Sequence, residues 1–274
     1  MSILELLSKT MKEPIPFGSL SDGWFHYLSL IFVIFCTYIF TRYLKHKNQK
    51  QIQKYLLIFA IILITFEIYK QVIYSYSNAW HYRWYAFPFQ FCSIPMYVAL
   101  ITGLTKKKAV YEAGISFLAT YGLFAGLAVM LHPGDVFVDT IGINIQTMIH
   151  HGGIAIVGFS LLFSKQVSYK INTLIKASVV FSIVVLIAIL LNAIFNTWIN
   201  DGTFNMFFIN PKFTSNIPIL FDIQPHVNAV VFNLIYYFGF TLVALIVFKI
   251  NTSFIYIYEK KKPLKEQQLQ KSKA

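Results

Sequence analysis

Residues 171–195 read INTLIKASVVFSIVVLIAILLNAIF, and this stretch decides the class of fold. Its only charged residue is Lys176, one turn inside the block. A helix needs ~20 mainly apolar residues to cross the ~30 Å hydrocarbon core of a bilayer. Backbone polar groups in lipid must be satisfied within the segment, which favours a helix over an open strand. The stretch therefore predicts a membrane-spanning helix.

The same pattern recurs along the whole chain. Only 12% of the 274 residues are charged and 57% are hydrophobic, whereas soluble domains average about 25% charged residues. Seven blocks are long enough to span, at residues 24–44, 54–77, 85–104, 109–131, 141–163, 171–195 and 226–249. Pro88 and Pro95 interrupt the third block and predict a bend there. We therefore expect an all-α polytopic membrane protein, a bundle of seven transmembrane helices within one domain at 24–250.

The formal net charge of +12 is distributed unevenly along the sequence. Lysine and arginine residues follow the first, third and fifth blocks and fill the tail. Basic loops stay in the cytoplasm, so this pattern predicts an outside N-terminus and a cytoplasmic C-terminus in the cell membrane. Residues 1–23 become an outside segment whose residues 2–12 have the apolar spacing of an interfacial helix. The basic tail at 251–274 is expected to contact anionic lipid rather than nucleic acid. Residues 196–225 are expected to fold over the outer mouth of the helix bundle as a cap.

A small set of ionisable side chains lies inside the apolar blocks. They are Glu67, Lys70, Cys92, Glu112, His150 and His151. At ~1.5 Å per residue, Cys92 lies roughly 10 Å below the outer ends of the helices, and Glu67 and His151 roughly 15 Å. Asn192 lies near the outer end of the sixth block. Ionisable groups in a bilayer usually face the bundle interior, so these depths predict one polar cavity that opens outward.

Each of these residues also has an ordinary structural explanation. A membrane cysteine often serves as a small packing residue, and a buried histidine often joins two helices by a hydrogen bond. Glu67 can pair with Lys70 three residues later on the same helix. The chemical interpretation is a cysteine nucleophile activated by a histidine base, which fits acyl transfer through a thioester. Glu67 would then orient the imidazole, and Asn192 would stabilise an oxyanion.

The chain resembles the YwaF-type bacterial integral membrane proteins, which are related to an animal transmembrane phospholipid acyltransferase. The resemblance covers most of residues 60–245. It rests on Glu67, on the run Pro88-Phe89-Gln90-Phe91-Cys92, on Gln146 to Gly152 with His150 and His151, and on Asn192 followed by the run from Asn205 to Pro211.

This resemblance implies a seven-helix fold and cysteine-dependent acyl transfer between phospholipids. It places Cys92 as the nucleophile and His151 as the base, because glycine follows His151 directly. Glu67, Gln90, His150 and Asn192 are the supporting residues of the polar cavity. The partners that it implies are membrane phospholipids, and the acyl donor stays unidentified.

Two other classes of function remain open from the sequence. One is a non-catalytic transporter or receptor-like binder of a small or lipidic ligand. The other is a metal-dependent membrane hydrolase, because six of the seven histidines lie on or near the outer side. No pair of them has convincing i, i+4 ligand spacing, so we assign no metal ligands. A phosphate-binding Gly-rich loop is also missing from the sequence, and we expect no cofactor.

Overall fold

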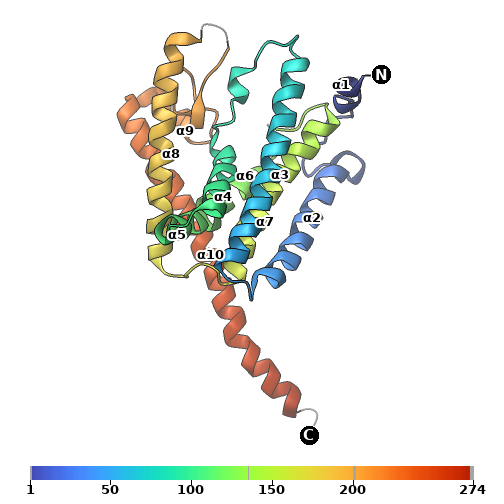
Figure 1. Ribbon diagram of the computed structural model, residues 1–274, viewed down its shortest axis with the longest axis vertical. Coiled ribbons are helices and arrows are strands. Elements are labelled where there is room, and N and C mark those ends of the chain that lie inside the picture. Colours follow the sequence, from blue (N-terminus) through green and yellow to red (C-terminus); the bar gives the residue numbers. More distant parts are fainter. Residues whose placement is uncertain (1, 135, 200–201, 272–274) are drawn as a thin grey trace.

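The computed structural model describes residues 2–134, 136–199 and 202–271, and helices dominate this part of the chain (Figure 1). Six helices within it are long and apolar enough to cross a membrane. They are α2 (Leu20–Leu44), α3 (Gln49–Tyr76), the continuous helix of α5 (Lys108–Phe117), η3 (Leu118–Gly122) and α6 (Leu123–Leu131), α7 (Ile141–Phe163), α8 (Ile171–Trp198) and α10 (Ala229–Lys271). The protein is therefore an all-α, multi-pass membrane protein.

The third expected block, residues 85–104, does not form a full-length transmembrane helix. Its helical part is η2 (Phe91–Ser93) continued by α4 (Ile94–Leu104), which is about 20 Å long at ~1.5 Å per residue. Pro95 lies in the first turn of α4, where the missing N–H costs no hydrogen bond. Upstream, the chain has only the short turn η1 (Trp84–Ala86) before Pro88. The two prolines thus leave the first part of the block unwound rather than bending one long helix.

This partly unwound segment nevertheless runs the length of α3 in the opposite direction. Gln71 of α3 donates a hydrogen bond from Nε2 to the Ala86 carbonyl at 2.7 Å. Five turns earlier in α3, Gln53 donates to the carbonyl of Thr105 at 2.7 Å. Residues 86–105 therefore follow α3 from one end of the bundle towards the other, in part without helical structure.

The basic loops gather at one end of the bundle. Gln166, in the loop after α7, donates from Nε2 to the Leu44 carbonyl at 2.8 Å and so joins the first and third basic loops. The N-terminus lies at the other end, where the amide of Met11 donates to the Asp139 carbonyl at 2.7 Å. The expected interfacial helix at 2–12 is shorter here, since α1 covers Ile3–Leu7 only. The loops after α2 and α7 and the N-terminal segment thus lie at opposite ends of the bundle (Figure 1).

The long helix α7 forms the centre of the core, and glycines allow α6 to approach it closely. A Cβ on Gly126 of α6 would lie 2.7 Å from the His151 carbonyl oxygen and from the Ala155 nitrogen. A Cβ on Gly158 of α7 would lie 2.7 Å from Cβ of Leu123. Small residues at such contacts let the backbones of membrane helices pack directly. This contact fixes the position of the α7 turn that carries the histidines.

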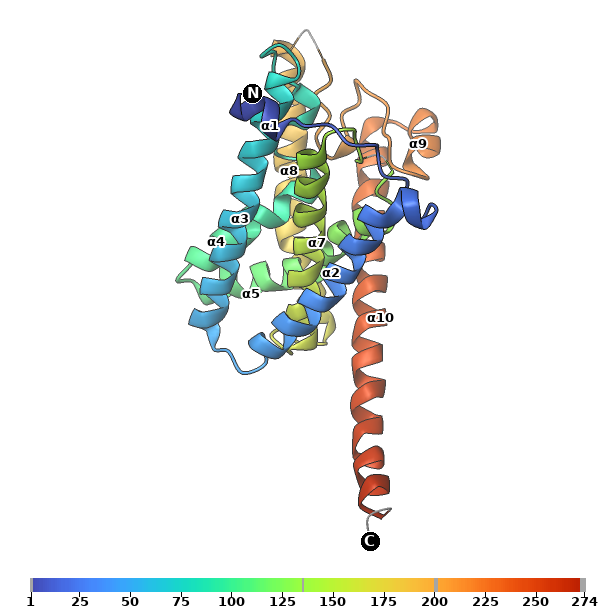
Figure 2. The same cartoon turned by 90° about the vertical axis from the view of Figure 1, so that its right-hand side faces the viewer.

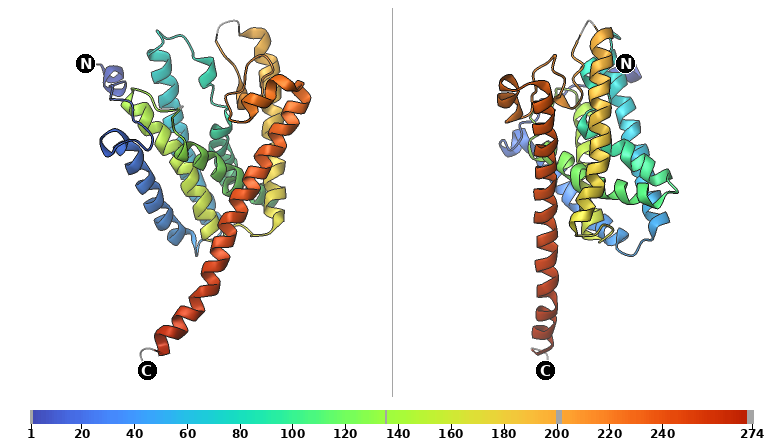
Figure 3. Two further views of the ribbon diagram at one scale, coloured as in Figure 1. Left: turned by 180° about the vertical axis from the view of Figure 1, so that it is seen from behind. Right: turned by 90° about the vertical axis from the view of Figure 1, so that its left-hand side faces the viewer.

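The last helix, α10, extends well beyond the rest of the bundle on the basic side (Figures 2 and 3). At the opposite end, the chain between α8 and α10 forms η4 (Met206–Phe208), α9 (Leu220–Ile223) and η5 (Gln224–His226). These short turns pack at the end of the bundle beside the segment before η2, as the hydrogen bonds described below show. The expected cap at 196–225 is therefore a folded layer, with residues 200–201 outside the described part.

Candidate functional site

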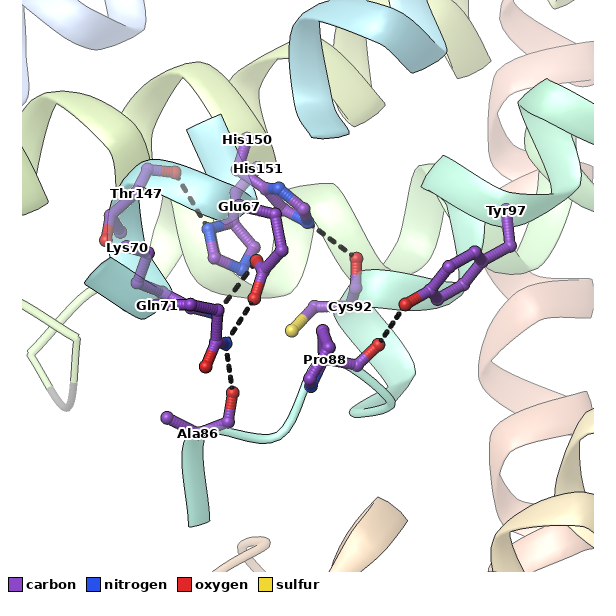
Figure 4. A network of polar contacts seen from close by, with 10 residues as sticks. All are labelled: Glu67, Lys70, Gln71, Ala86, Pro88, Cys92, Tyr97, Thr147, His150 and His151. Atoms are coloured by element: carbon purple, nitrogen blue, oxygen red, sulfur yellow. Dashed lines mark hydrogen bonds and ion pairs between the residues drawn. The ribbon is translucent and has the colours of Figure 1, made fainter. Parts of the chain in front are cut away.

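A buried carboxylate on α3 forms the first part of the candidate site. Glu67 is 4% exposed, and its Oε2 lies 2.9 Å from Nζ of Lys70 on the same helix. Gln71 donates from Nε2 to Glu67 Oε1 at 2.6 Å and also reaches the Ala86 carbonyl. The expected i, i+3 ion pair is confirmed. Gln71 could not be singled out from the sequence, although it stands at i+4 from Glu67. This network connects α3 to the unwound segment before Cys92 (Figure 4).

Cys92 lies in the short turn η2, where the unwound segment becomes helix. The turn is held from one side by Tyr97, whose hydroxyl donates to the Pro88 carbonyl at 2.8 Å. On the other side, His150 Nε2 lies 3.0 Å from the Cys92 carbonyl oxygen. A carbonyl oxygen can only accept, so Nε2 of His150 carries the proton of this bond. His150 therefore positions the backbone of Cys92 rather than contacting its thiol.

His151 offers the lone pair that a base needs. Its Nδ1 lies 2.8 Å from the Thr147 carbonyl oxygen, one turn earlier in α7, and donates to it. Nε2 of the neutral ring is then unprotonated, and it is buried with no hydrogen-bond partner among the described residues. The ring is thus oriented by Thr147, where the sequence led us to expect Glu67.

Figure 4 shows these groups from three separate elements gathered in one place. The Cys92 thiol projects to the side of η2 on which the Glu67 carboxyl group and the His151 ring lie. The ion pair of Glu67 and Lys70 lies beside both groups. No hydrogen bond links the thiol to either imidazole in the described part of the chain. The structure therefore brings together α3, η2 and α7 at Glu67, Cys92 and the two histidines.

Gln90 and Asn192 have a different role from the one expected. Asn192 is 2% exposed, and its amide donates to the Met206 carbonyl at 3.0 Å and accepts from the Met206 amide at 2.8 Å. Gln90 donates to the Asn205 carbonyl and accepts from the Phe207 amide, both at 3.0 Å. Both side-chain amides are therefore engaged at each end and hold residues 205–207. Asn192 is not free to stabilise an oxyanion.

The held segment carries a backbone strain that these bonds support. Phe207 has φ of 60° and Phe208 has φ of 57°, in the left-handed region that residues other than glycine rarely adopt. The Phe207 ring contacts the ring of Phe91, the residue before Cys92, with centroids 5.8 Å apart. Through this contact the loop after α8 covers the turn that carries the cysteine.

A tyrosine near this turn could not be recognised from the sequence, because it lies within an apolar helix. Tyr236 of α10 is fully buried, and its ring stacks on Phe240 with centroids 4.1 Å apart. Its hydroxyl has no hydrogen-bond partner in the described ranges. The apolar run around it reads as lipid-facing or core sequence, so its polar atom could not be selected without the tertiary contacts.

The histidines do not assemble a metal-ligand set in the part of the chain that the structure describes. Within that part, no three side chains of His, Cys, Asp or Glu converge as a group that could hold an ion. His26, for example, lies on another helix, α2, and its Nε2 is 2.8 Å from the Met130 carbonyl oxygen.

Comparison with known proteins gives one match. The sequence model of the TMEM164 family matches residues 19–256, which include five of the six long apolar helices in full and most of the apolar part of α10. No curated protein and no solved structure matches this chain.

Proposed function

Because the chain belongs to the TMEM164 family, we propose that it is a membrane acyltransferase that uses Cys92 as nucleophile and His151 as base. Its substrates in this proposal are membrane phospholipids, in line with the resemblance to YwaF-type proteins and their acyltransferase relative. The observation that supports the proposal is that the Cys92 thiol projects to the side on which the His151 ring lies, and that Nε2 of this buried ring has no hydrogen-bond partner among the described residues.

The proposed reaction proceeds through a thioester. Nε2 of His151 takes the proton of the Cys92 thiol, and the thiolate attacks an ester carbonyl of one phospholipid. A carbon–sulfur bond forms, the ester carbon–oxygen bond breaks, and the leaving alcohol oxygen takes the proton from His151. A hydroxyl of a second, lysophospholipid molecule then attacks the thioester and passes its proton through His151 to the departing thiolate. The chain ends unchanged, and one acyl group has moved.

The neighbouring residues support this chemistry by position. His150 holds the Cys92 carbonyl, and Thr147 holds His151 in the tautomer that leaves Nε2 free. Glu67 and Lys70 neutralise one another, which limits the cost of burying two charges beside the thiol.

The membrane topology belongs to the same proposal. We place the N-terminus outside and the C-terminus in the cytoplasm of the cell membrane, because the basic loops share one end of the bundle. Residues 77–104 then make the seventh crossing, partly as unwound chain packed along α3. Irregular backbone is tolerated at membrane depth where protein buries it.

The test is acyl transfer in lipid vesicles that contain the purified protein. The vesicles hold a phospholipid with a deuterated acyl chain and a lysophospholipid with a different headgroup, and mass spectrometry follows the label. We expect His151→Gln to slow transfer by about 10²–10⁴-fold, the usual contribution of a general base, and Cys92→Ser to abolish it.

The matched control is Cys36→Ser, since Cys36 is the other cysteine of the chain and lies on α2. Thermal unfolding in detergent checks that each variant is folded. Undiminished transfer by folded Cys92→Ser would refute the nucleophile. Absence of both transfer and a hydroxylamine-sensitive acyl adduct in the unaltered protein would favour the non-catalytic binder.

A further inference from the structure

A groove of about 620 Å³ lies between α2, α3 and α7. Helices α2 and α3 are close together near the turn at residues 45–48 and diverge towards their other ends, with α7 between them (Figures 1 and 2). Gly152 and Gly153 of α7 line the groove, and a Cβ on them would lie 2.7 Å from Val33 and 3.1 Å from Phe59 respectively. Phe32 of α2 and Ile58 of α3 stand on its two walls.

This groove is separate from the cysteine site. It is lined by the face of α7 that carries Ile145, Ile149 and Ile156, and neither His150 nor His151 belongs to its lining. The two imidazoles instead bond to the carbonyls of Cys92 and Thr147. A ligand in the groove would therefore meet a different face of α7 from the one that carries the proposed chemistry.

The charge in the lining of the groove lies at one end only. Lys54 is its single charged residue, and Tyr43 lies at the same end. The ammonium group of Lys47 stands 4.5 Å from the centroid of the Tyr43 ring, which brings a second positive charge to this end. No acidic side chain pairs with Lys54 among the residues that the structure describes. The groove thus combines an apolar body with a basic end.

We propose that this groove binds one acyl chain of an anionic phospholipid, with the lipid phosphate at Lys54 and Lys47. Basic pockets between transmembrane helices recognise anionic lipid headgroups in this way. Along α3 the groove runs from Lys54 to Leu63, roughly 14 Å at ~1.5 Å per residue, and along α2 its lining extends from Tyr43 to Phe25, roughly 27 Å. An acyl chain spans about half of the ~30 Å hydrocarbon core, so the groove is long enough for the chain of a lipid in the leaflet on the basic side.

The bound lipid in this pose is not a substrate of Cys92. Its ester bonds lie at the Lys54 end, and its terminal methyl group reaches Leu63, one turn before Glu67 in α3. The inference therefore does not depend on the proposed acyl transfer, and it stands or falls on lipid binding alone.

The experiment compares lipid retention by four variants and the unaltered protein. Each is reconstituted in nanodiscs of equal parts phosphatidylglycerol and phosphatidylethanolamine, extracted gently, and examined by native mass spectrometry. Ile58→Trp fills the groove; its control is Ile61→Trp, because the two residues are 50% and 52% exposed on the same helix and Ile61 does not line the groove. Lys54→Gln removes the charge; its control is Lys106→Gln in another basic loop.

We expect the unaltered protein and both controls to retain phosphatidylglycerol in preference to phosphatidylethanolamine. Ile58→Trp should lose the retained lipid, and Lys54→Gln should lower the preference about fivefold, the effect of one lysine beside an anionic membrane. Retention by Ile58→Trp equal to that by Ile61→Trp would overturn the groove as the site. Equal retention of both lipids by the unaltered protein would overturn the headgroup assignment. Melting temperatures show which variants are folded, and an unfolded Ile58→Trp is replaced by Ile62→Trp, which fills the same wall.

Discussion

The hydrogen bonds between Asn192 and Met206 allow a stability prediction with a defined magnitude. Replacing Asn192 with leucine keeps the size and branching of the side chain and removes its amide. Met206 is buried, so its N–H loses its partner without gaining water, and its carbonyl keeps only the amide of Ile209, 3.4 Å away. The perturbation therefore isolates the hold that α8 has on the loop covering Cys92.

One orphaned donor and one weakened acceptor set the expected cost, because the Met206 carbonyl keeps the amide of Ile209. A buried donor or acceptor left without a partner costs about 1–3 kcal/mol. We expect Asn192→Leu to lower the free energy of unfolding by about 1–4 kcal/mol, a sizeable part of the ~5–15 kcal/mol that is typical of native proteins. For a chain of this size, at about 2 °C per kcal/mol, that loss corresponds to a fall of about 2–8 °C in melting temperature.

The assay is thermal unfolding in detergent micelles, followed by tryptophan fluorescence. Asn251→Leu is the matched control, because the Asn251 amide donates only to the Val247 carbonyl one turn earlier in α10. Its removal leaves no orphaned backbone group, and the change should stay within ~0.5 kcal/mol. A loss for Asn192→Leu no greater than that for Asn251→Leu would refute the reasoning.

Gln90 extends the test to the other side of the same segment. Gln90→Leu orphans the Phe207 amide and leaves the Asn205 carbonyl with only the amide of Phe208, 3.3 Å away. The side-chain amides of Gln90 and Asn192 both bond residues 205–207. Once one substitution has freed this segment, the bonds made by the other amide contribute less to stability. The double variant should lose less than the sum of the two single losses, by about 0.5–3 kcal/mol. Strict additivity would show that the two sets of bonds act on independent parts of the loop.

Two further predictions concern the α3 ion pair and the contact between α6 and α7. Lys70→Met leaves the buried Glu67 carboxylate unpaired and should lower the free energy of unfolding by about 3 kcal/mol. This is the lower end for a broken buried pair, because Lys70 is partly exposed. Lys70→Met combined with Glu67→Gln should recover most of that loss in the same melting assay. Equal losses in the single and double variants would contradict this. Gly126→Ala forces a Cβ to 2.7 Å from backbone atoms of α7 and should cost about 1–3 kcal/mol, while Gly239→Ala, with nothing within 4 Å of its added Cβ, should be close to neutral. Comparable melting temperatures of these two alanine variants would count against a close backbone contact at Gly126.

Features that depend on short stretches of sequence could be predicted well. Whether a segment is long and apolar enough to cross a bilayer is a sum over ~20 neighbouring residues, and six of the seven expected blocks became such helices. The Glu67–Lys70 ion pair was equally accessible, since residues three apart on a helix face the same side. Depth counting also placed Glu67, Cys92 and the histidines at similar levels, and Figure 4 shows them together.

The unwound start of the third block shows where local reasoning failed. Pro88 and Pro95 signalled an interruption, but their effect depends on what lies beside the freed backbone. Gln71 of α3 bonds the Ala86 carbonyl, and Tyr97 bonds the Pro88 carbonyl. These partners make an irregular backbone affordable at this depth, and they come from side chains whose positions the local sequence does not specify.

Tertiary structure alone decided the roles of the polar residues. Gln90 and Asn192 were recognised as important from the sequence, yet their amides hold residues 205–207, and Gln90 bonds partners more than a hundred positions away. The same holds for the two imidazoles. His150 of α7 donates a hydrogen bond to the Cys92 carbonyl of η2, and of the two only His151 has an Nε2 without a hydrogen-bond partner among the described residues. Hydropathy along this chain determines which segments enter the membrane, because transfer into lipid depends on each segment separately. It does not determine which atoms meet, because a hydrogen bond requires two groups placed within about 3 Å by packing of the whole bundle.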